Sequence, residues 1–242
     1  AYVNKMDRIG SDFERVVEMM KSRLGANPVP IQLPFGKEDT FKGCIDLIEM
    51  KLYLFDDSTL GVKYDILDIP ADYLEACKHA REYMIEKISE HDEELYHKYV
   101  EGVEMSKEEI KRAIRSATIA MNITPVICGS SFKNKGVQTM LDAIVDYLPS
   151  PLDVPPVTGI HPKTEEPLTR QTADNEKFSA LAFKIMTDPY VGKLTYFRVY
   201  SGVLTSGSYI YNSMLVPPNA SAGFCRCTPT GARRSTGFTR AI

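Results

Sequence analysis

Four residues near the amino end, Asn4-Lys5-Met6-Asp7, carry side chains suited to reading a purine base. The Asp7 carboxylate can accept two N–H donors from the edge of guanine, which adenine cannot offer in that arrangement. The Asn4 amide can donate and accept beside it, and the Lys5 stem can lie along the flat base while its ammonium stays in water. The spacing predicts a guanine-reading loop, and a polar turn after a strand is the alternative interpretation.

A second candidate loop, Gly129-Ser130-Ser131-Phe132, follows a short apolar run at 124–128 that is typical of a buried parallel strand. If residues 1–3 end another strand of that sheet, both loops leave the same edge, where ligands bind in sheets of this kind. A backbone N–H of the second loop could donate to guanine O6, a position at which adenine carries an amino group. A plain strand-to-helix turn is the alternative.

The composition restricts the class of protein. A chain of 242 residues with 43% hydrophobic residues can form one large or two ordinary domains. A net charge of −3 argues against binding nucleic acid by bulk charge, although a local basic patch is compatible with it. The sequence shows neither an apolar run of membrane-spanning length nor a signal peptide pattern, so we expect a cytoplasmic protein, monomeric and without a membrane partner.

Neither the cysteines nor the histidines have the spacing of metal ligands, so we predict no metal site. Cys225-Arg-Cys227 lacks the second ligand pair that a zinc site needs. The three remaining cysteines stand singly in apolar surroundings, as buried thiols of a reducing compartment do: Cys44, Cys77 and Cys128.

The elements that would position the first loop follow it directly. Ser11 and Glu14 have capping-box spacing, and apolar residues at helical intervals predict a helix that ends near Gly25. These apolar residues are Phe13, Val16, Val17, Met20 and Leu24. The order strand, polar loop, amphipathic helix is that of a doubly wound α/β domain.

From residue 29 the pattern changes to short strands and then to helices. An extended stretch at 29–34 precedes predicted strands at 41–48, 51–55 and 62–69, which indicate a small antiparallel unit. Helical periodicity returns at 74–88 and 92–100, and again after a second capping box, Ser106 with Glu109. The acidic residues here predict solvated helix faces, with a partner-docking face as the alternative.

After the second loop, Gly136 opens a predicted helix with Val137, Met140, Leu141, Ile144 and Val145 on one face. Proline-rich residues from 149 predict a linker up to residue 177. Strands are then expected at 178–187, 193–201 and from 209, as at the start of a β-barrel. Composition and periodicity thus predict an incomplete α/β domain, an inserted α+β unit and a β domain.

From Asn4 to about Asn212 the chain resembles bacterial elongation factor G, a family of translational GTPases. The segments that carry the resemblance are Asn4-Lys5-Met6-Asp7-Arg8, residues 25–34, residues 128–137, Tyr147-Leu148-Pro149-Ser150-Pro151 and residues 178–185. They are long and cover most of the chain. The Tyr147 segment and the strand from Phe178 favour this family over sister translational GTPases of the release-factor or ribosome-protection type.

The resemblance implies the C-terminal part of an α/β GTPase domain at 1–148, with an inserted subdomain at about 29–121. A linker at 149–177 and the start of a second-domain β-barrel at 178–212 would follow. By family role Asn4 and Asp7 would read guanine, Lys5 would pack on the base, and Ser130, Ser131 and Phe132 would form the second loop. The implied ligand is GTP or GDP with Mg²⁺. The implied partner is the ribosome, through rRNA and ribosomal proteins, and the implied activity is GTP hydrolysis coupled to translocation of tRNA and mRNA.

The sequence departs from the family pattern in two respects. Ser131 stands where many members have Ala, and no G-x-x-x-x-G-K-[ST] phosphate loop occurs in the chain. We therefore expect a fragment whose phosphate loop, magnesium ligands and catalytic residues lie before Ala1. On this expectation the parent protein is a GTPase, whereas this chain neither binds GTP tightly nor hydrolyses it. A non-catalytic ribosome-binding module is the competing hypothesis.

Residues 213–242 depart most, because they are rich in Ser, Thr, Pro, Gly and Arg and have no period. Back-translating residues 218–241 with suitable codons and reading one base earlier gives a sequence that looks like the family's continuation. We therefore predict a reading-frame shift near Ser213, which leaves an aberrant tail. A disordered basic arm that touches rRNA is the alternative.

Overall fold

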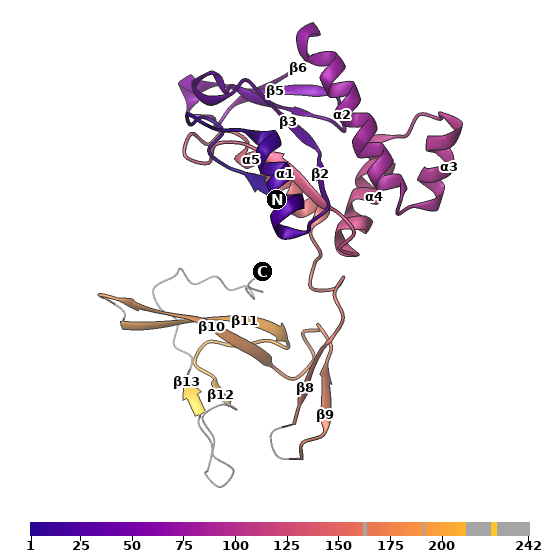
Figure 1. Ribbon diagram of the computed structural model, residues 1–242. Coiled ribbons are helices and arrows are strands. Elements are labelled where there is room, and N and C mark those ends of the chain that lie inside the picture. Colours follow the sequence, from indigo (N-terminus) through magenta and orange to yellow (C-terminus); the bar gives the residue numbers. More distant parts are fainter. Residues whose placement is uncertain (162–163, 191, 212–223, 227–242) are drawn as a thin grey trace. The chain divides into compact units, whose positions relative to one another are not determined.

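The structure is a computed structural model that describes residues 1–161, 164–190, 192–211 and 224–226 (Figure 1). The chain divides into two units, Ala1–Pro149 and Ser150–Ile242, each described by itself below. The first unit ends one residue after the predicted end of the α/β domain at 148. Within the described ranges, no helix has the length and apolar character needed to cross a membrane.

Three parallel strands form the sheet of the first unit, in the order β1 (Tyr2–Val3), β7 (Thr124–Cys128) and β2 (Pro28–Pro30). Val3 lies opposite Cys128, so the loops that follow β1 and β7 leave the same edge of the sheet, as predicted. Val29, predicted to begin the inserted unit, lies instead in β2, opposite Pro125. Local pattern could not show this, because the strand is short and its partner is distant in sequence.

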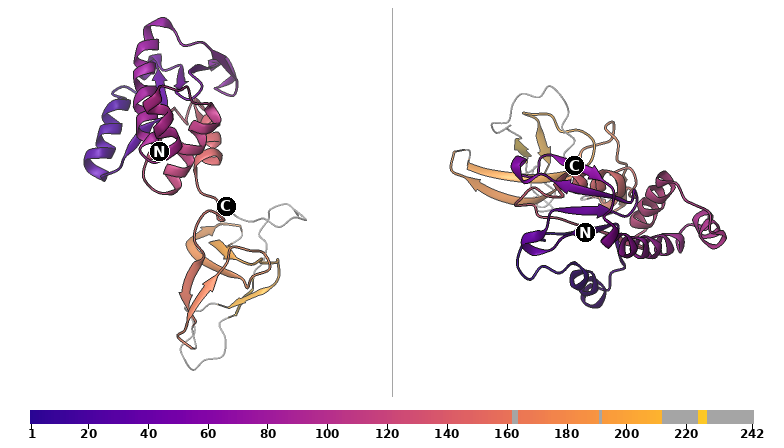
Figure 2. Two further views of the ribbon diagram at one scale, coloured as in Figure 1. Left: turned by 90° about the vertical axis from the view of Figure 1, so that its right-hand side faces the viewer. Right: turned by 90° about the horizontal axis from the view of Figure 1, so that it is seen from above.

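The two faces of the parallel sheet are covered by different helices. Val126 of β7 packs with Phe13 and Val17 of α1 (Phe13–Leu24). Ile127, the next residue along β7, faces the opposite way, because side chains alternate along a strand, and joins the cluster that includes Tyr147 of α5 (Val137–Tyr147). Figure 2 shows α1 and α5 on opposite sides of the unit. The first unit is therefore a mixed α/β fold built on a parallel sheet.

A second, antiparallel sheet lies between β2 and β7 in the chain. Its strands follow sequence order: β3 (Gln32–Phe35), β4 (Gly43–Asp46), β5 (Lys51–Phe55) and β6 (Tyr64–Leu67). Two short 3₁₀ helices connect these strands, η1 (Glu38–Thr40) and η2 (Asp57–Thr59). Three helices follow, α2 (Ala71–Ser89), α3 (Glu93–Glu101) and α4 (Lys107–Ile119). The predicted order of antiparallel strands and then helices is confirmed. β5 has the predicted bounds, whereas β4 and β6 are shorter than the predicted ranges.

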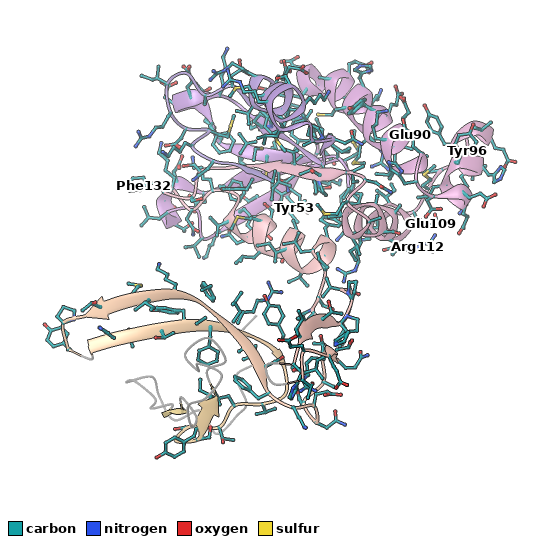
Figure 3. All side chains as sticks on the ribbon, turned by 60° about the horizontal axis from the view of Figure 1, so that its bottom comes forward. Tyr53, Glu90, Tyr96, Glu109, Arg112 and Phe132 are labelled. Atoms are coloured by element: carbon teal, nitrogen blue, oxygen red, sulfur yellow. The ribbon has the colours of Figure 1, made fainter. Side chains whose placement is uncertain are left out.

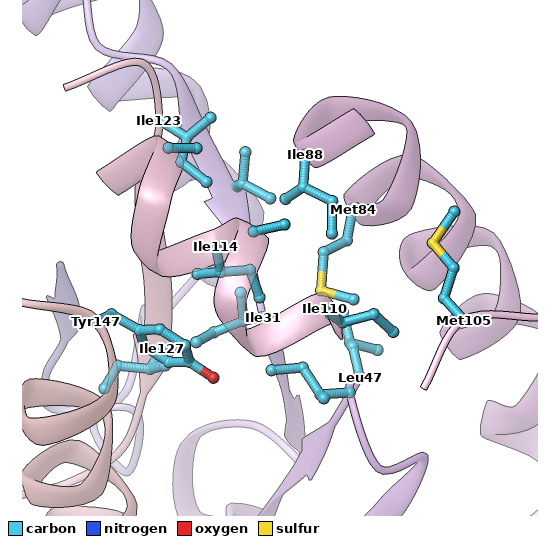
Figure 4. Packing of buried hydrophobic residues seen from close by; sticks show 14 of the residues in the cluster. Ile31, Leu47, Met84, Ile88, Met105, Ile110, Ile114, Ile123, Ile127 and Tyr147 are labelled. Atoms are coloured by element: carbon cyan, nitrogen blue, oxygen red, sulfur yellow. The ribbon is translucent and has the colours of Figure 1, made fainter. Parts of the chain in front are cut away.

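Apolar side chains from both sheets and from α2 and α4 meet in one core (Figure 4). Met84 and Ile88 of α2 and Ile110 and Ile114 of α4 are completely buried there. Burial of one such side chain stabilises a fold by about 1.5–3 kcal/mol. This core is what fixes the antiparallel sheet and its helices to the parallel sheet.

One predicted capping box is correct and the other is wrong. Ser106 caps α4: its backbone N–H donates to Glu109 Oε2 over 2.9 Å, and its hydroxyl accepts from the Glu109 N–H. At α1 the N-cap is Asp12, whose Oδ1 accepts from the Arg15 N–H at 2.8 Å. The Ser11 hydroxyl instead donates to the Met6 carbonyl at 2.8 Å and accepts from the Glu38 N–H at 3.3 Å, so its bonds lie outside the helix.

The apolar face predicted for α5 is only partly packed. Leu141, Ile144 and Val145 remain 54%, 44% and 77% exposed. A narrower stripe of α5, which includes Tyr147, faces the core. Periodicity identifies an apolar face but does not show which part of it another element covers.

The second unit contains three antiparallel strand pairs in its described part. They are β8 (Val157–Ile160) with β9 (Pro167–Arg170), β10 (Ser179–Asp188) with β11 (Gly192–Ser201), and β12 (Tyr209–Tyr211) with β13 (Phe224–Arg226). The strands expected near 178–187, 193–201 and 209 are present. The β8–β9 pair was not predicted, because residues 149–177 were expected to form a linker without strands. The predicted aberrant tail lies outside the described residues except for 224–226, so the frame shift stays a prediction.

The three cysteines of the first unit are free and buried, as predicted: Cys44, Cys77 and Cys128. Burial raises the pKa of Cys44 to about 12 and also raises the pKa of Cys128, because a thiolate is poorly solvated in an apolar interior. These thiols therefore pack as small hydrophobic side chains and are not nucleophiles.

Candidate functional site

The two candidate loops lie side by side at the carboxyl edge of β1 and β7. The Met6 N–H donates to the Gly129 carbonyl at 3.1 Å, and the Gly129 N–H donates to the Val3 carbonyl at 3.0 Å. The Ser131 N–H donates to Asn4 Oδ1 at 3.0 Å, which joins residues 127 positions apart. The structure thus brings Asn4 and Ser131 together although they come from opposite ends of the unit's sequence.

The Asn4 side chain fastens the two loops to each other. Its Oδ1 accepts from the Lys5 N–H at 2.8 Å as well as from Ser131. Lys5 has a φ of 66°, a conformation that a non-glycine residue adopts only where its surroundings hold it. Because Oδ1 is already occupied, a contact between Asn4 and a base would have to use the Nδ2 group, which donates.

Asp7 presents a carboxylate that stays ionised at neutral pH. The Ser130 hydroxyl is the largest cause of its lowered pKa, and Lys133 adds to it, with Nζ 3.6 Å from Asp7 Oδ2. Ser130 Oγ is itself buried and makes no hydrogen bond of good geometry with any residue in the described part of the chain. The Ser130 hydroxyl therefore lies near the carboxylate without a fixed partner, and the ionised Asp7 can only accept hydrogen bonds.

The remaining predicted site residues lie on the surface. Lys5 is exposed, and the Phe132 side chain is 97% exposed. Figure 3 shows Phe132 at the opposite end of the first unit from Tyr96 of α3. Its ring is therefore free to meet a ligand or a partner, and it contributes nothing to the core.

Sequence reasoning missed two residues of this region, Lys133 and Lys135, and named Gly129 in the second loop without recognising its close contacts. Lys133 pairs with Asp7, and Lys135 is buried beneath the loop. Gly129 is needed because a Cβ there would lie 2.3 Å from Tyr2 Oη and 2.4 Å from the Lys135 carbonyl oxygen. All three lie in the segment 128–137, but nothing in their residue types shows which lysine is buried.

Two cavities of the first unit lie away from these loops. One, of about 130 Å³, is lined by polar residues that include Asp46, Glu49 and Lys111, and the other, of about 190 Å³, is mainly apolar. Neither includes Asn4, Asp7 or Ser131. The two loops lie together as expected, but neither of these cavities lies between them.

The predicted site residues do not form a magnesium site by themselves. Within the described ranges, no three His, Cys, Asp or Glu side chains lie together as ligands of a metal ion. Asp7 is the one carboxylate among the predicted site residues, and we derive no step through Mg²⁺.

Among known protein families, the elongation factor Tu GTP-binding domain matches residues 1–150. The chain belongs to this family of translational GTPase domains. Among solved structures, it is similar to the protein ttk003000868 from Thermus thermophilus, with 28% sequence identity and a TM-score of 0.64. The similarity covers 86% of this chain but only 28% of the length of that protein.

Proposed function

We propose that this chain carries the guanine-recognition loops of a translational GTPase of the elongation factor G type, which moves tRNA and mRNA through the ribosome with hydrolysis of GTP. Asn4, Lys5 and Asp7 would contact the base from one loop, and Ser130, Ser131 and Phe132 from the other. The ligand would be GTP or GDP, and the partner the ribosome. The protein would work in the cytoplasm.

The observation that carries the proposal is the 3.0 Å bond from the Ser131 N–H to Asn4 Oδ1. It fixes the two loops at one edge of the sheet, beside an ionised carboxylate on Asp7. An acceptor-only carboxylate selects a base edge with two adjacent N–H donors, which guanine has and adenine lacks. The family membership of residues 1–150 supports a guanine nucleotide as the ligand.

The domain organisation of the proposal follows the resemblance. Residues 149–177 would connect the nucleotide-binding domain to a β-barrel that begins near Phe178 and contacts the ribosome. Two alternatives use the same parts: a ribosome-binding module without catalysis, and a sister GTPase that acts in release or ribosome protection.

Base selectivity tests the proposal. We expect the chain to bind GDP more tightly than ADP, and Asp7→Asn to shift its preference toward XDP, because xanthine carries a carbonyl where guanine carries an amino group. Losing a complementary hydrogen bond to the base should weaken GDP binding about 10-fold or more. Isothermal titration or NMR titration of the chain with GDP, ADP and XDP measures this.

Asp65→Asn is the matched control for the base-selectivity test, since Asp65 is an exposed aspartate of β6. It should keep the wild-type order of affinities. Equal affinity of the wild-type chain for GDP and ADP would exclude a guanine site at these loops, and so would an Asp7→Asn variant that still prefers GDP.

Hydrolysis is a separate part of the proposal. The 242-residue sequence contains no G-x-x-x-x-G-K-[ST] phosphate loop. We therefore propose that this chain by itself hydrolyses no GTP. Phosphate release from GTP by the purified chain, measured against a no-protein blank, should stay at background. Steady turnover would contradict this part of the proposal while leaving the base-reading part intact.

A further inference from the structure

Among the residues that the structure describes, Lys135 is the only charged residue that is buried, with 3% of its surface exposed. Its Nζ donates to the Phe41 carbonyl at 3.1 Å and lies 2.7 Å from Asp57 Oδ1. Phe41 immediately follows η1 and Asp57 lies in η2, so both partners belong to the connections of the antiparallel sheet β3–β6. A lysine of the second guanine loop is thus anchored in a different sheet.

The backbone of Lys135 closes the loop that carries Ser131. The Ser130 N–H donates to the Lys135 carbonyl at 2.8 Å, and the Lys135 N–H donates back to the Ser130 carbonyl at 3.0 Å. Ser131 is the next residue, and its N–H holds Asn4. A continuous set of bonds therefore connects Asp57, through Lys135 and Ser130, to Asn4.

Connections of the antiparallel sheet also form hydrogen bonds with residues in or next to both loops. Gln138 Nε2, just after the second loop, donates to the Gly61 carbonyl at 2.9 Å. The Glu38 N–H donates to the Met6 carbonyl at 3.0 Å, and Glu38 Oε1 accepts from the Gly10 N–H at 2.8 Å. The two loops therefore share one support outside the parallel sheet.

A buried ammonium is costly to a fold unless its protons are paired. The Asp57 side chain is 72% exposed, so Asp57→Asn creates no cavity. It keeps an amide oxygen that can accept from Lys135 Nζ and removes only the negative charge. Removing the Lys135 ammonium, in contrast, leaves the Phe41 carbonyl without its donor and frees the loop from the antiparallel sheet.

We propose that Lys135 is a positioning residue for guanine recognition: it holds the Ser130–Ser131 loop at the distance that Asn4 and the base require. Through it, the β3–β6 sheet sets the affinity of the loops for guanine. The inference rests on the proposed function of these loops. A lysine that merely stabilises the whole unit is the competing explanation.

Backbone hydrogen exchange of the full chain, with and without GDP, tests the proposal. In Lys135→Met we expect the Ser131 and Met6 amides to exchange about 10-fold faster, because a buried hydrogen-bonded group has lost its partner. Core amides such as that of Ile114 should not change. In Asp57→Asn, which keeps the carbonyl contact, the same loop amides should exchange about threefold faster. GDP affinity should fall by similar factors.

Asp68→Asn is the matched control, because Asp68 Oδ1 pairs with Lys51 Nζ at 2.6 Å and is 91% exposed, away from the loops. It should change neither loop exchange nor GDP affinity. If Lys135→Met speeds exchange at loop and core amides alike, or if neither Lys135→Met nor Asp57→Asn changes loop exchange, the proposal is overturned. If Lys135→Met does not fold, Asp57→Asn alone decides.

The experiment also separates this inference from the proposed function. If the wild-type chain binds no GDP, the proposed function fails, yet faster exchange confined to the loops would still show that Lys135 positions them. If GDP binds and the loop amides do not respond to either variant, the guanine site stands and the role of Lys135 is wrong.

Discussion

Two regions of the first unit differ in how far apart in the sequence their hydrogen-bonded and ion-paired residues lie. In the loop corner, formed by residues 4–7 and 129–136, Asn4 bonds a residue 127 positions away and Lys135 one 94 positions away. In the helix pair α3–α4, the Ser106–Glu109 box spans three residues, and Lys98 pairs with Glu109 across 11. Similar chemical groups thus connect distant segments in one region and neighbouring ones in the other.

This difference predicts where a substitution should lower stability most. The corner contains buried polar groups that water does not reach, such as the Lys135 ammonium and Ser130 Oγ. The helix pair carries its ion pairs on the surface, where water replaces a lost partner: the Glu94 and Arg112 side chains are 60% and 58% exposed. We therefore expect changes in the corner to exceed equivalent changes in the helix pair.

The largest effect is expected for Gly129→Ala in the corner. The added Cβ would lie 2.4 Å from the Lys135 carbonyl oxygen, a backbone atom that also accepts the Ser130 N–H. Shifting it should lower the free energy of unfolding of the first unit by about 2–4 kcal/mol, measured by urea denaturation.

Gly159→Ala is the matched control for this glycine substitution, because nothing lies within 4 Å of a Cβ at that position. It should change the free energy of unfolding by less than about 0.5 kcal/mol. If the Gly129→Ala chain is as stable as wild type, the loop corner accommodates the added Cβ without loss of stability. The expected difference between the two regions would then be wrong.

A smaller loss is expected for Ser106→Ala in the helix pair. The substitution removes the hydroxyl that accepts the Glu109 N–H at 3.3 Å and should cost about 1 kcal/mol, measured by the same denaturation. Ser116→Ala, at an exposed position inside α4, should be neutral or slightly stabilising because Ala favours helix. If Ser106→Ala lowers the free energy of unfolding as much as Gly129→Ala does, the expected difference between the two regions is wrong.

The smallest effect concerns pH. The pKa of Asp7 is lowered in the folded protein, so its contribution to stability is present above its unfolded value of about 4 and is lost as pH falls through the lower folded value. Asp7→Asn should therefore flatten the acid side of the stability curve by no more than about 0.5 kcal/mol, since the Lys133 pair is partly exposed.

Glu109 in the helix pair should behave in the same direction. Lys98, and then Ser106, lower its pKa to about 2, so Glu109→Gln should also reduce the loss of stability below about pH 4. Denaturation of both variants between about pH 7 and pH 3 checks this. Stability that rises on acidification in the wild type but not in the variants would reverse the assigned sign.

Features that depend on near neighbours in the chain can be predicted from the sequence. The helix that starts after Gly136, the Ser106–Glu109 box and the strand at 124–128 follow from spacing, because helical periodicity and capping act within one or two turns. The residue types of Asn4 and Asp7 also predict purine recognition, which the base-selectivity experiment tests.

Tertiary packing, in contrast, settles which groups are buried and which distant segments meet. It placed Lys135 inside and Phe132 outside the same short loop, engaged Ser11 with Met6 in place of the expected cap, and added Pro28–Pro30 to the parallel sheet. Each outcome depends on partners far away in sequence or on a loop's closure. Residue type and periodicity carry no information about such partners, because they describe one segment at a time.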